Sequence, residues 1–312
     1  MSAALAPLLL AARHSRTILI ASLATGIALP GVAQLARPWL AEGVAAALFF
    51  AALRVAPRAA IGAPRALPRT LALVGVLQVV LPVAALLALA ALGRLDSLPA
   101  LALAVMLAAP PIAGSPSLTV LVGQDPAPAL RLLVLGTLLM PLTVLPTLWL
   151  MPALGTPGAV LAAAARLLAV IGIAVAAALV VRGWLLPRPA PRTLSALDGA
   201  GVLFLCVVIL GLMSALGPAL RTDPWGVAGW LAVAAALNVG LQLAVGRLHP
   251  AGPGAAAGQA IAAGNRNIAL FLVSLPASVT DPLLLFIGCY QIPMYLTPVL
   301  LRRFYAAPRP PG

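Results

Sequence analysis

The sequence predicts an all-α polytopic membrane protein with ten transmembrane helices, arranged as two inverted five-helix repeats in which the fourth and ninth helices are broken and cross. Hydrophobic residues make up 63% of the 312-residue chain and charged residues 8%, and the mean hydropathy is +1.12. Ordinary soluble domains carry roughly a quarter charged residues, so this chain lacks the polar surface that would cover a soluble core. The composition therefore excludes a soluble enzyme, a disordered chain and a secreted disulfide scaffold.

Apolar runs separated by Arg, Pro and Gly give ten predicted spans, each long enough to cross or nearly cross a bilayer. In the first half they are Thr17–Pro30, Leu40–Leu53, Thr70–Leu92, Leu98–Val122 and Ala129–Leu150. In the second half they are Gly158–Val181, Ala196–Leu216, Trp225–Val245, Ala255–Leu275 and Pro282–Leu301.

The basic residues predict the orientation. All 19 basic residues are arginines, and with six acidic residues they give a net charge of +13. The arginines lie in short loops rather than along one stripe, which argues against a nucleic-acid partner. With the N-terminus inside, 14 arginines fall on the cytoplasmic side and four on the other. This positive-inside bias predicts a multi-pass protein of the bacterial plasma membrane with both termini in the cytoplasm.

Five spans per half make the second half enter the membrane from the opposite side, which is the geometry of an inverted repeat. We place repeat one at about 17–151 and repeat two at about 158–304, within a single membrane domain covering 1–312. Gln78 in the third span has a counterpart in Gln242 in the eighth, and the Pro-Leu-Thr of the fifth span resembles the Leu-Thr-Pro of the tenth.

The fourth span contains Pro110, Pro111 and Pro116 around Gly114. Each proline removes a backbone donor and clashes with the preceding turn, and broken backbone survives at membrane depth only inside protein or beside a cavity. We therefore expect Pro110–Ser117 to be non-helical, with Ser115 and Ser117 facing a central site. A kinked but continuous structural helix is the alternative.

The ninth span contains Gly264-Asn265-Arg266-Asn267, the one mid-span stretch that carries a charge. Two polar interruptions at corresponding places in two repeats point to a transport site. All six acidic residues lie in loops or at span ends, which leaves two interpretations of Arg266. A substrate anion binds it directly, or half-helix carbonyls and Asn side chains satisfy it permanently.

Other polar residues within the spans are individually typical of helix–helix hydrogen bonds. They are Gln78, Thr137, Thr143, Ser214, Asn238, Gln242 and Gln291.

Together these motifs resemble the bile acid:sodium symporter family, in its ten-helix bacterial form. The resemblance rests on the proline-rich break, on Gly123-Gln124-Asp125, on Gly136-Thr137 with the residues that follow, on Gly264–Asn267, and on Leu77–Pro82. It implies panel helices at 17–53 and 158–216 and core helices at 70–150 and 225–301. It also implies a secondary transporter of small organic anions that works by alternating access.

We therefore expect a substrate site that includes Ser115, Ser117, Asn238, Asn265, Arg266 and Asn267. For sodium the resemblance implies Gln78, Thr137 and Ser117 as ligands. The chain departs from the family where a sodium-binding glutamate is replaced by Ala262 and a glutamine by Arg266. We therefore expect Arg266 to stand where a sodium charge would be, with sodium as the sole candidate cofactor and no strict dependence on it.

Other classes remain as alternatives. A receptor or structural membrane protein is one, and an arsenite-type efflux carrier on a related fold is another, although the fourth span has no cysteine for that chemistry. A membrane enzyme such as a prenyl transferase would need paired acids to hold magnesium, and the sequence offers only isolated ones, so we expect no enzymatic activity. Substrate identity, direction of transport and oligomeric state have no sequence signal.

Overall fold

The computed structural model describes residues 5–54, 64–154, 156–250 and 252–306. Within these ranges the secondary structure is helical, apart from one isolated antiparallel bridge between Pro111 and Arg266. Seven helices are long and apolar enough to cross a membrane, as expected for a polytopic membrane protein. They are Pro30–Arg54, Leu67–Ala91, Ala127–Trp149, Pro157–Leu185, Pro191–Thr222, Pro224–Leu248 and Ala277–Thr297.

Seven is fewer than ten because three predicted spans contain no uninterrupted helix of that length. The first predicted span forms only the 14-residue helix α2 (Ser15–Ala28). The fourth is split into α8 (Leu98–Ala108) and α9 (Ser115–Leu121). In the ninth, α16 (Gly252–Gly264) is followed by a 3₁₀ segment, Ile268–Val273. The count of ten transmembrane helices and their inverted repeat therefore stay predictions.

Residue contacts divide the chain into two compact units, and each unit draws on both halves of the sequence. The first comprises Met1–Ala56, Ala162–Val227 and Ala269–Gly288. The second comprises Pro57–Leu161, Ala228–Ile268 and Cys289–Gly312. The segment 269–288 lies in the first unit, whereas the predicted core helices include it. The assignment of panel and core roles stays a prediction.

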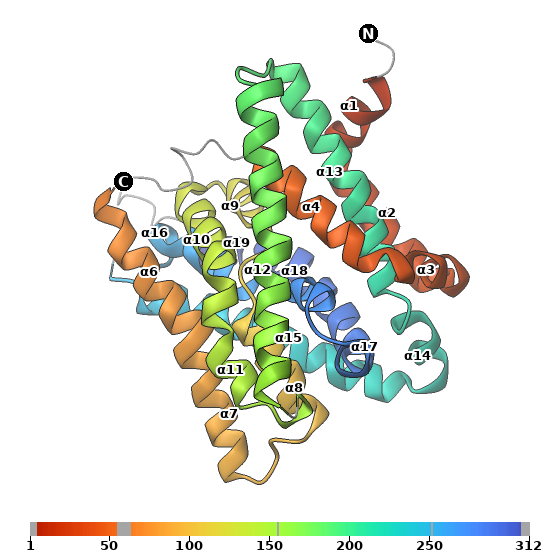
Figure 1. The fold of residues 1–312 in the computed structure, drawn as a ribbon, viewed down its shortest axis with the longest axis vertical. Coiled ribbons are helices and arrows are strands. Elements are labelled where there is room, and N and C mark those ends of the chain that lie inside the picture. Colours follow the sequence, from red (N-terminus) through yellow and green to blue (C-terminus); the bar gives the residue numbers. More distant parts are fainter. Residues whose placement is uncertain (1–4, 55–63, 155, 251, 307–312) are drawn as a thin grey trace. The chain divides into compact units, whose positions relative to one another are not determined.

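In the first unit the helices pack around α13 (Pro191–Leu212), beside α1 (Ala6–Arg13), α2 and α4 (Leu40–Arg54) (Figure 1). Gly199 allows the closest approach, because a Cβ there would lie 1.8 Å from the main-chain oxygen of Leu8. Small residues of this kind let membrane helices pack tightly where the hydrophobic effect between them is absent. Arg54 and Asp198 pair at 2.6 Å near one end of the α4–α13 contact.

The remaining helices of the first unit are short or run on into the second. α3 (Pro30–Ala36) and the 3₁₀ turn Arg37–Trp39 lead into α4, and α14 (Leu216–Thr222) follows α13. α17 (Ala277–Thr280) and the turn Asp281–Leu283 precede α18 (Leu284–Leu300). α12 (Pro157–Val180) ends in a π-helical turn, Val181–Leu185.

The second unit contains both helix breaks, at 109–114 and 265–267. Its long helices are α6 (Leu67–Gly75) with the π turn Val76–Val80 and α7 (Leu81–Ala91), then α10 (Ala127–Thr143) with α11 (Leu145–Trp149), and α15 (Pro224–Leu248). The C-terminal α19 (Arg302–Tyr305) packs on α16. A buried apolar cluster joins Leu77, Leu132 and Ala263 from three of these segments, so the core of this unit surrounds the end of α16.

Candidate functional site

The two helix breaks of the second unit meet and pair with each other. The N–H of Ile112 donates to the carbonyl of Asn265 at 2.9 Å, and the N–H of Asn267 donates to the carbonyl of Pro110 at 2.7 Å. Between these bonds lies the antiparallel bridge of Pro111 with Arg266. Backbone groups freed from a helix within a bilayer must find partners inside the protein, and each break supplies partners for the other. We call this junction, residues 109–114 with 265–267, the crossing.

The predicted break in the fourth span is confirmed, but its extent was partly wrong. Residues 109–114 are non-helical, whereas Ser115, Pro116 and Ser117 form the first turn of α9. Proline is tolerated in the first helical turn because the N–H it lacks has no helical acceptor there. Pro116 therefore starts a helix, while Pro110 and Pro111 follow the end of one.

Arg266 is held by main-chain carbonyls and is 2% exposed. Its Nε donates to the carbonyl of Ala263 at 2.6 Å, and its Nη1 donates to that of Ala109 at 2.8 Å. A longer contact of 3.5 Å joins Nη2 to the carbonyl of Leu77. The guanidinium therefore joins three segments of the second unit: the end of α16, the end of α8 and the π turn.

The Leu77 carbonyl is available to Arg266 for a local reason. The π turn ends with the N–H of Leu81 bonding five residues back to the carbonyl of Val76. The next residue in that register is Pro82, which has no N–H to give to Leu77. The carbonyl is thus left without a helical donor, and a buried carbonyl in that state needs another partner.

Helix ends, rather than a carboxylate, balance the charge of Arg266. Neither of the two ion pairs found among the described residues includes it. Its two closest acceptors lie at the C-terminal ends of α8 and α16, and each such end carries about half a negative charge. Two helix ends therefore offset roughly one positive charge. Of the two interpretations of Arg266, the carbonyls of the half-helices are the partners seen here.

A buried polar network continues from the crossing towards the C-terminal helix. Asn238 donates from Nδ2 to the carbonyl of Gly264 at 2.6 Å and to Oδ1 of Asn265 at 3.1 Å. Gln242 donates from Nε2 to Oδ1 of Asn238 and to Oγ1 of Thr297, both at 2.7 Å. The hydroxyl of Tyr305 donates to Oε1 of Gln242 at 2.9 Å. The network satisfies these buried groups and joins α15, α16, α18 and α19.

The remaining predicted substrate-site residues differ in burial and in hydrogen bonding. Ser115 is fully buried, and its Oγ has no hydrogen-bond partner among the described residues. Ser117 is exposed, whereas Asn267 is half-buried and its side chain makes no hydrogen bond to a described residue. The structure thus joins Asn238 and Asn265 in one hydrogen-bond network and places Arg266 and Asn267 in the crossing beside it.

Two of the predicted ion ligands, Gln78 and Thr137, border the crossing: a Cβ on Gly136 would lie 2.6 Å from Nε2 of Gln78 and 3.2 Å from Cδ of Pro111. Gln78 and Thr137 are both buried. Oε1 of Gln78 accepts a hydrogen bond from Thr143 at 2.9 Å, an interaction typical of packing between membrane helices.

Sequence reasoning missed several groups at the crossing. The hydroxyl of Tyr290 donates to the carbonyl of Gly264, and Thr297 belongs to the Asn238 network. The acceptors of Arg266 are main-chain atoms, which residue type does not reveal. The cue that could have found one of them is Pro82, since a proline within a helix frees a carbonyl one turn earlier.

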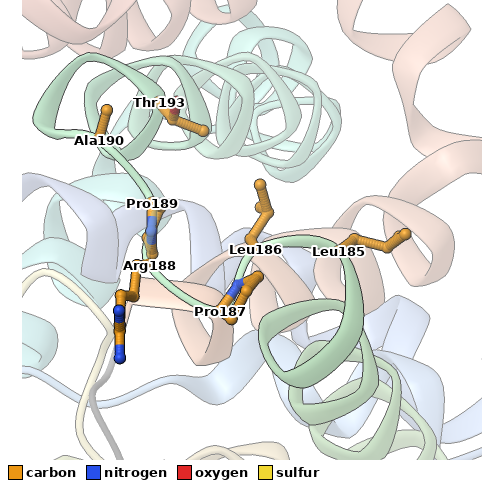
Figure 2. A pocket seen from close by; sticks show the side chains of 7 residues that line it. All are labelled: Leu185, Leu186, Pro187, Arg188, Pro189, Ala190 and Thr193. Atoms are coloured by element: carbon orange, nitrogen blue, oxygen red, sulfur yellow. The ribbon is translucent and has the colours of Figure 1, made fainter.

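The first unit contains a separate hollow of about 420 Å³ between the π turn that ends α12 and the start of α13 (Figure 2). It is lined by Leu185, Leu186, Pro187, Arg188, Pro189, Ala190 and Thr193. No residue of the crossing contributes to it.

No protein-family model and no curated protein matches the sequence of the chain.

Proposed function

We propose that the chain is a secondary transporter of small organic anions in the bacterial plasma membrane, working by alternating access in the manner of the bile acid:sodium symporters it resembles. The observation that carries this proposal is the crossing, where two interrupted helices from the two halves of the sequence pair through their backbones. Discontinuous helices that meet at membrane depth are typical of substrate sites in secondary transporters. A receptor or a structural membrane protein has no comparable need for them.

A repeated side-chain pair supports the inverted repeat on which this proposal depends. In the first half, Thr143 donates to Gln78 at 2.9 Å. In the second half, Gln242 donates to Thr297 at 2.7 Å. The glutamines lie in the third and eighth predicted spans and the threonines in the fifth and tenth. The same two residue types therefore join corresponding helices in both halves.

The contacts of Arg266 support the expectation that transport does not depend strictly on sodium. The guanidinium already occupies carbonyl oxygens from three segments, and carbonyl oxygens are ligands that a hard cation would use. A sodium ion beside it would meet a like charge at short range in a poorly screened environment. The same repulsion disfavours a cationic substrate. Arg266 would then act as a resident cation. Asn267, the next residue, and Ser115, whose buried Oγ has no partner among the described residues, offer polar groups with spare hydrogen-bonding capacity.

Uptake by proteoliposomes tests the proposal. The probes are radiolabelled small carboxylates and sulfonates, with either sodium or choline as the external cation. We expect saturable uptake of at least one anion that survives replacement of sodium by choline. Binding of an anion without flux would favour a receptor. Uptake that vanishes in choline would contradict the resident-cation role of Arg266 while leaving the transporter class intact.

Two variants of Arg266 distinguish a requirement for its positive charge from a requirement for a polar side chain. Arg266→Lys keeps the positive charge and three donors, whereas Arg266→Gln keeps polarity and removes the charge. We expect the Lys variant to keep measurable uptake and the Gln variant to lose it while still inserting as a monodisperse protein. An active Gln variant would contradict any requirement for a fixed charge at the crossing.

A further inference from the structure

The turn between α12 and α13 combines positive charge with exposed apolar surface. Arg182, Arg188 and Arg192 lie within eleven residues of one another, and no acidic residue occurs between Asp125 and Asp198. Asp198 is already paired with Arg54 at 2.6 Å. The three arginines are therefore not neutralised by any neighbour along the chain, and Arg188 and Arg192 are exposed.

The same turn presents two large apolar side chains. Trp184 is 86% exposed and Leu185 is 73% exposed. Both lie in the π turn that ends a helix long enough to span a membrane. Tryptophan at such a place is typical of the boundary between hydrocarbon and headgroups, so the arginines that follow would lie at headgroup level.

The backbone of the turn forms a hollow between these features. Pro187, Pro189 and Pro191 restrict the chain as it passes from the π turn into α13. The hollow of about 420 Å³ is lined by Leu185 to Ala190 and by Thr193, with Arg188 extending from its wall (Figure 2). Its volume falls within the range of small-ligand sites, roughly 300–1,000 Å³.

One donor group on this turn lacks an acceptor. Nη1 of Arg182 is buried and has no hydrogen-bond partner among the described residues. A free anion would meet the arginines but would gain nothing from Trp184 and Leu185. A molecule with both an anionic head and an acyl chain would use the exposed Arg188 and Arg192 together with Trp184 and Leu185.

We propose that the turn formed by residues 182–193 is a binding site for the headgroup of an anionic phospholipid. The phosphate contacts Arg188 and Arg192, the glycerol part lies in the hollow, and the acyl chains run along Trp184 and Leu185. Basic residues next to membrane helices attract anionic lipids with a free energy of about 1 kcal/mol each. Removing two of them corresponds to about 30-fold weaker binding. This site is independent of the proposed transport function.

The test measures lipid retention by native mass spectrometry and thermal stabilisation of the purified full-length protein. The probes are phosphatidylglycerol, phosphatidylcholine and inorganic phosphate. The test variant is Arg188→Gln with Arg192→Gln. The matched control is Arg94→Gln with Arg221→Gln, which removes two exposed arginines that lie outside this turn.

We expect phosphatidylglycerol, but not phosphatidylcholine, to bind and stabilise the wild type and the control, and the test variant to bind it about 30-fold more weakly. A further variant, Trp184→Ala, should also weaken phosphatidylglycerol binding. Equal weakening in the test and control variants would show non-specific attraction to net charge and overturn the proposal. Stabilisation by inorganic phosphate that matches that by the lipid, and that is unaffected by Trp184→Ala, would overturn it in favour of a free-anion site.

Discussion

Replacing Gly264 by Ala should disrupt the crossing through a single methyl group. A Cβ at this position would lie 2.5 Å from the main-chain oxygen of Asn238 and 2.5 Å from Cγ of Gln242. Neither is the far end of a flexible side chain, so the end of α16 or the facing turn of α15 must move. The Gly264 carbonyl accepts hydrogen bonds from Asn238 and Tyr290, and Arg266 follows two residues later. Overpacking of this kind costs about 1–3 kcal/mol, and the displacement would also lengthen the bonds of the guanidinium.

The assay is thermal unfolding of the purified protein, followed by tryptophan fluorescence at one fixed scan rate, because membrane proteins of this size often unfold irreversibly. Gly240→Ala is the matched control, since a Cβ there would meet no atom within 4 Å and alanine is the better helix former. We expect the Gly264 variant to melt several degrees below wild type and the control to melt at or above wild type. Coincident melting of both variants would refute the close packing of α16 on α15 at this point.

The remaining predictions concern the polar network, a surface ion pair and the topology. Tyr305→Phe leaves Oε1 of Gln242 without its buried donor and should cost about 1–3 kcal/mol at neutral pH, measured by the same melting assay. Burial raises the pKa of the Tyr305 phenol, so its contribution is complete below the unfolded pKa of about 10 and is lost as pH rises towards the folded value. The melting temperature of the wild type should therefore fall more steeply with pH than that of the Phe variant above about pH 10. Parallel curves of melting temperature against pH would contradict this. Arg37→Gln breaks an exposed ion pair with Asp281 and should change the free energy of unfolding by less than about 1 kcal/mol. A larger effect, seen as a clear fall in melting temperature, would show that solvent does not screen the pair. Cysteines introduced at Arg65 and Arg188, after Cys206 and Cys289 are removed, should react with an impermeant maleimide only in permeabilised cells, and labelling of intact cells would reverse the proposed orientation.

The sequence predicted the breaks well because their signals are local. Two adjacent prolines cannot continue a helix, and α8 ends at Ala108, with only Ala109 between it and Pro110. The error lay in the next turn, where Ser115 and Ser117 were expected to face one site. Because α9 already includes both, residues two apart point about 200° apart around the helix, and accordingly one is buried and the other exposed.

The partners of Arg266 were beyond the reach of sequence reasoning for a different reason. They are carbonyls of Ala109 and Leu77, which lie 157 and 189 residues away along the chain. Every residue has a carbonyl, so the residue types at 77 and 109 do not mark these two as ligands, and only Pro82 hints at the one of Leu77. The substrate-bound and carbonyl-bound interpretations of Arg266 therefore predict the same sequence.

The composition of the two breaks explains why an arginine belongs at the crossing. Prolines remove N–H donors but keep their carbonyls, so Pro82, Pro110 and Pro111 leave this region with more acceptors than donors. An asparagine or glutamine side chain adds acceptors as well as donors, so it would not correct the excess of carbonyl acceptors. The guanidinium has five N–H donors and no acceptor. Arg266 donates hydrogen bonds to carbonyls from three segments. Its positive charge is attracted to the partly negative C-terminal ends of α8 and α16. A proline-rich break and a donor-only cation are therefore complementary parts of one junction. The cost of burying the charge is offset by the Leu77 carbonyl, which Pro82 leaves without a helical donor, and by the Ala109 and Ala263 carbonyls at the ends of α8 and α16.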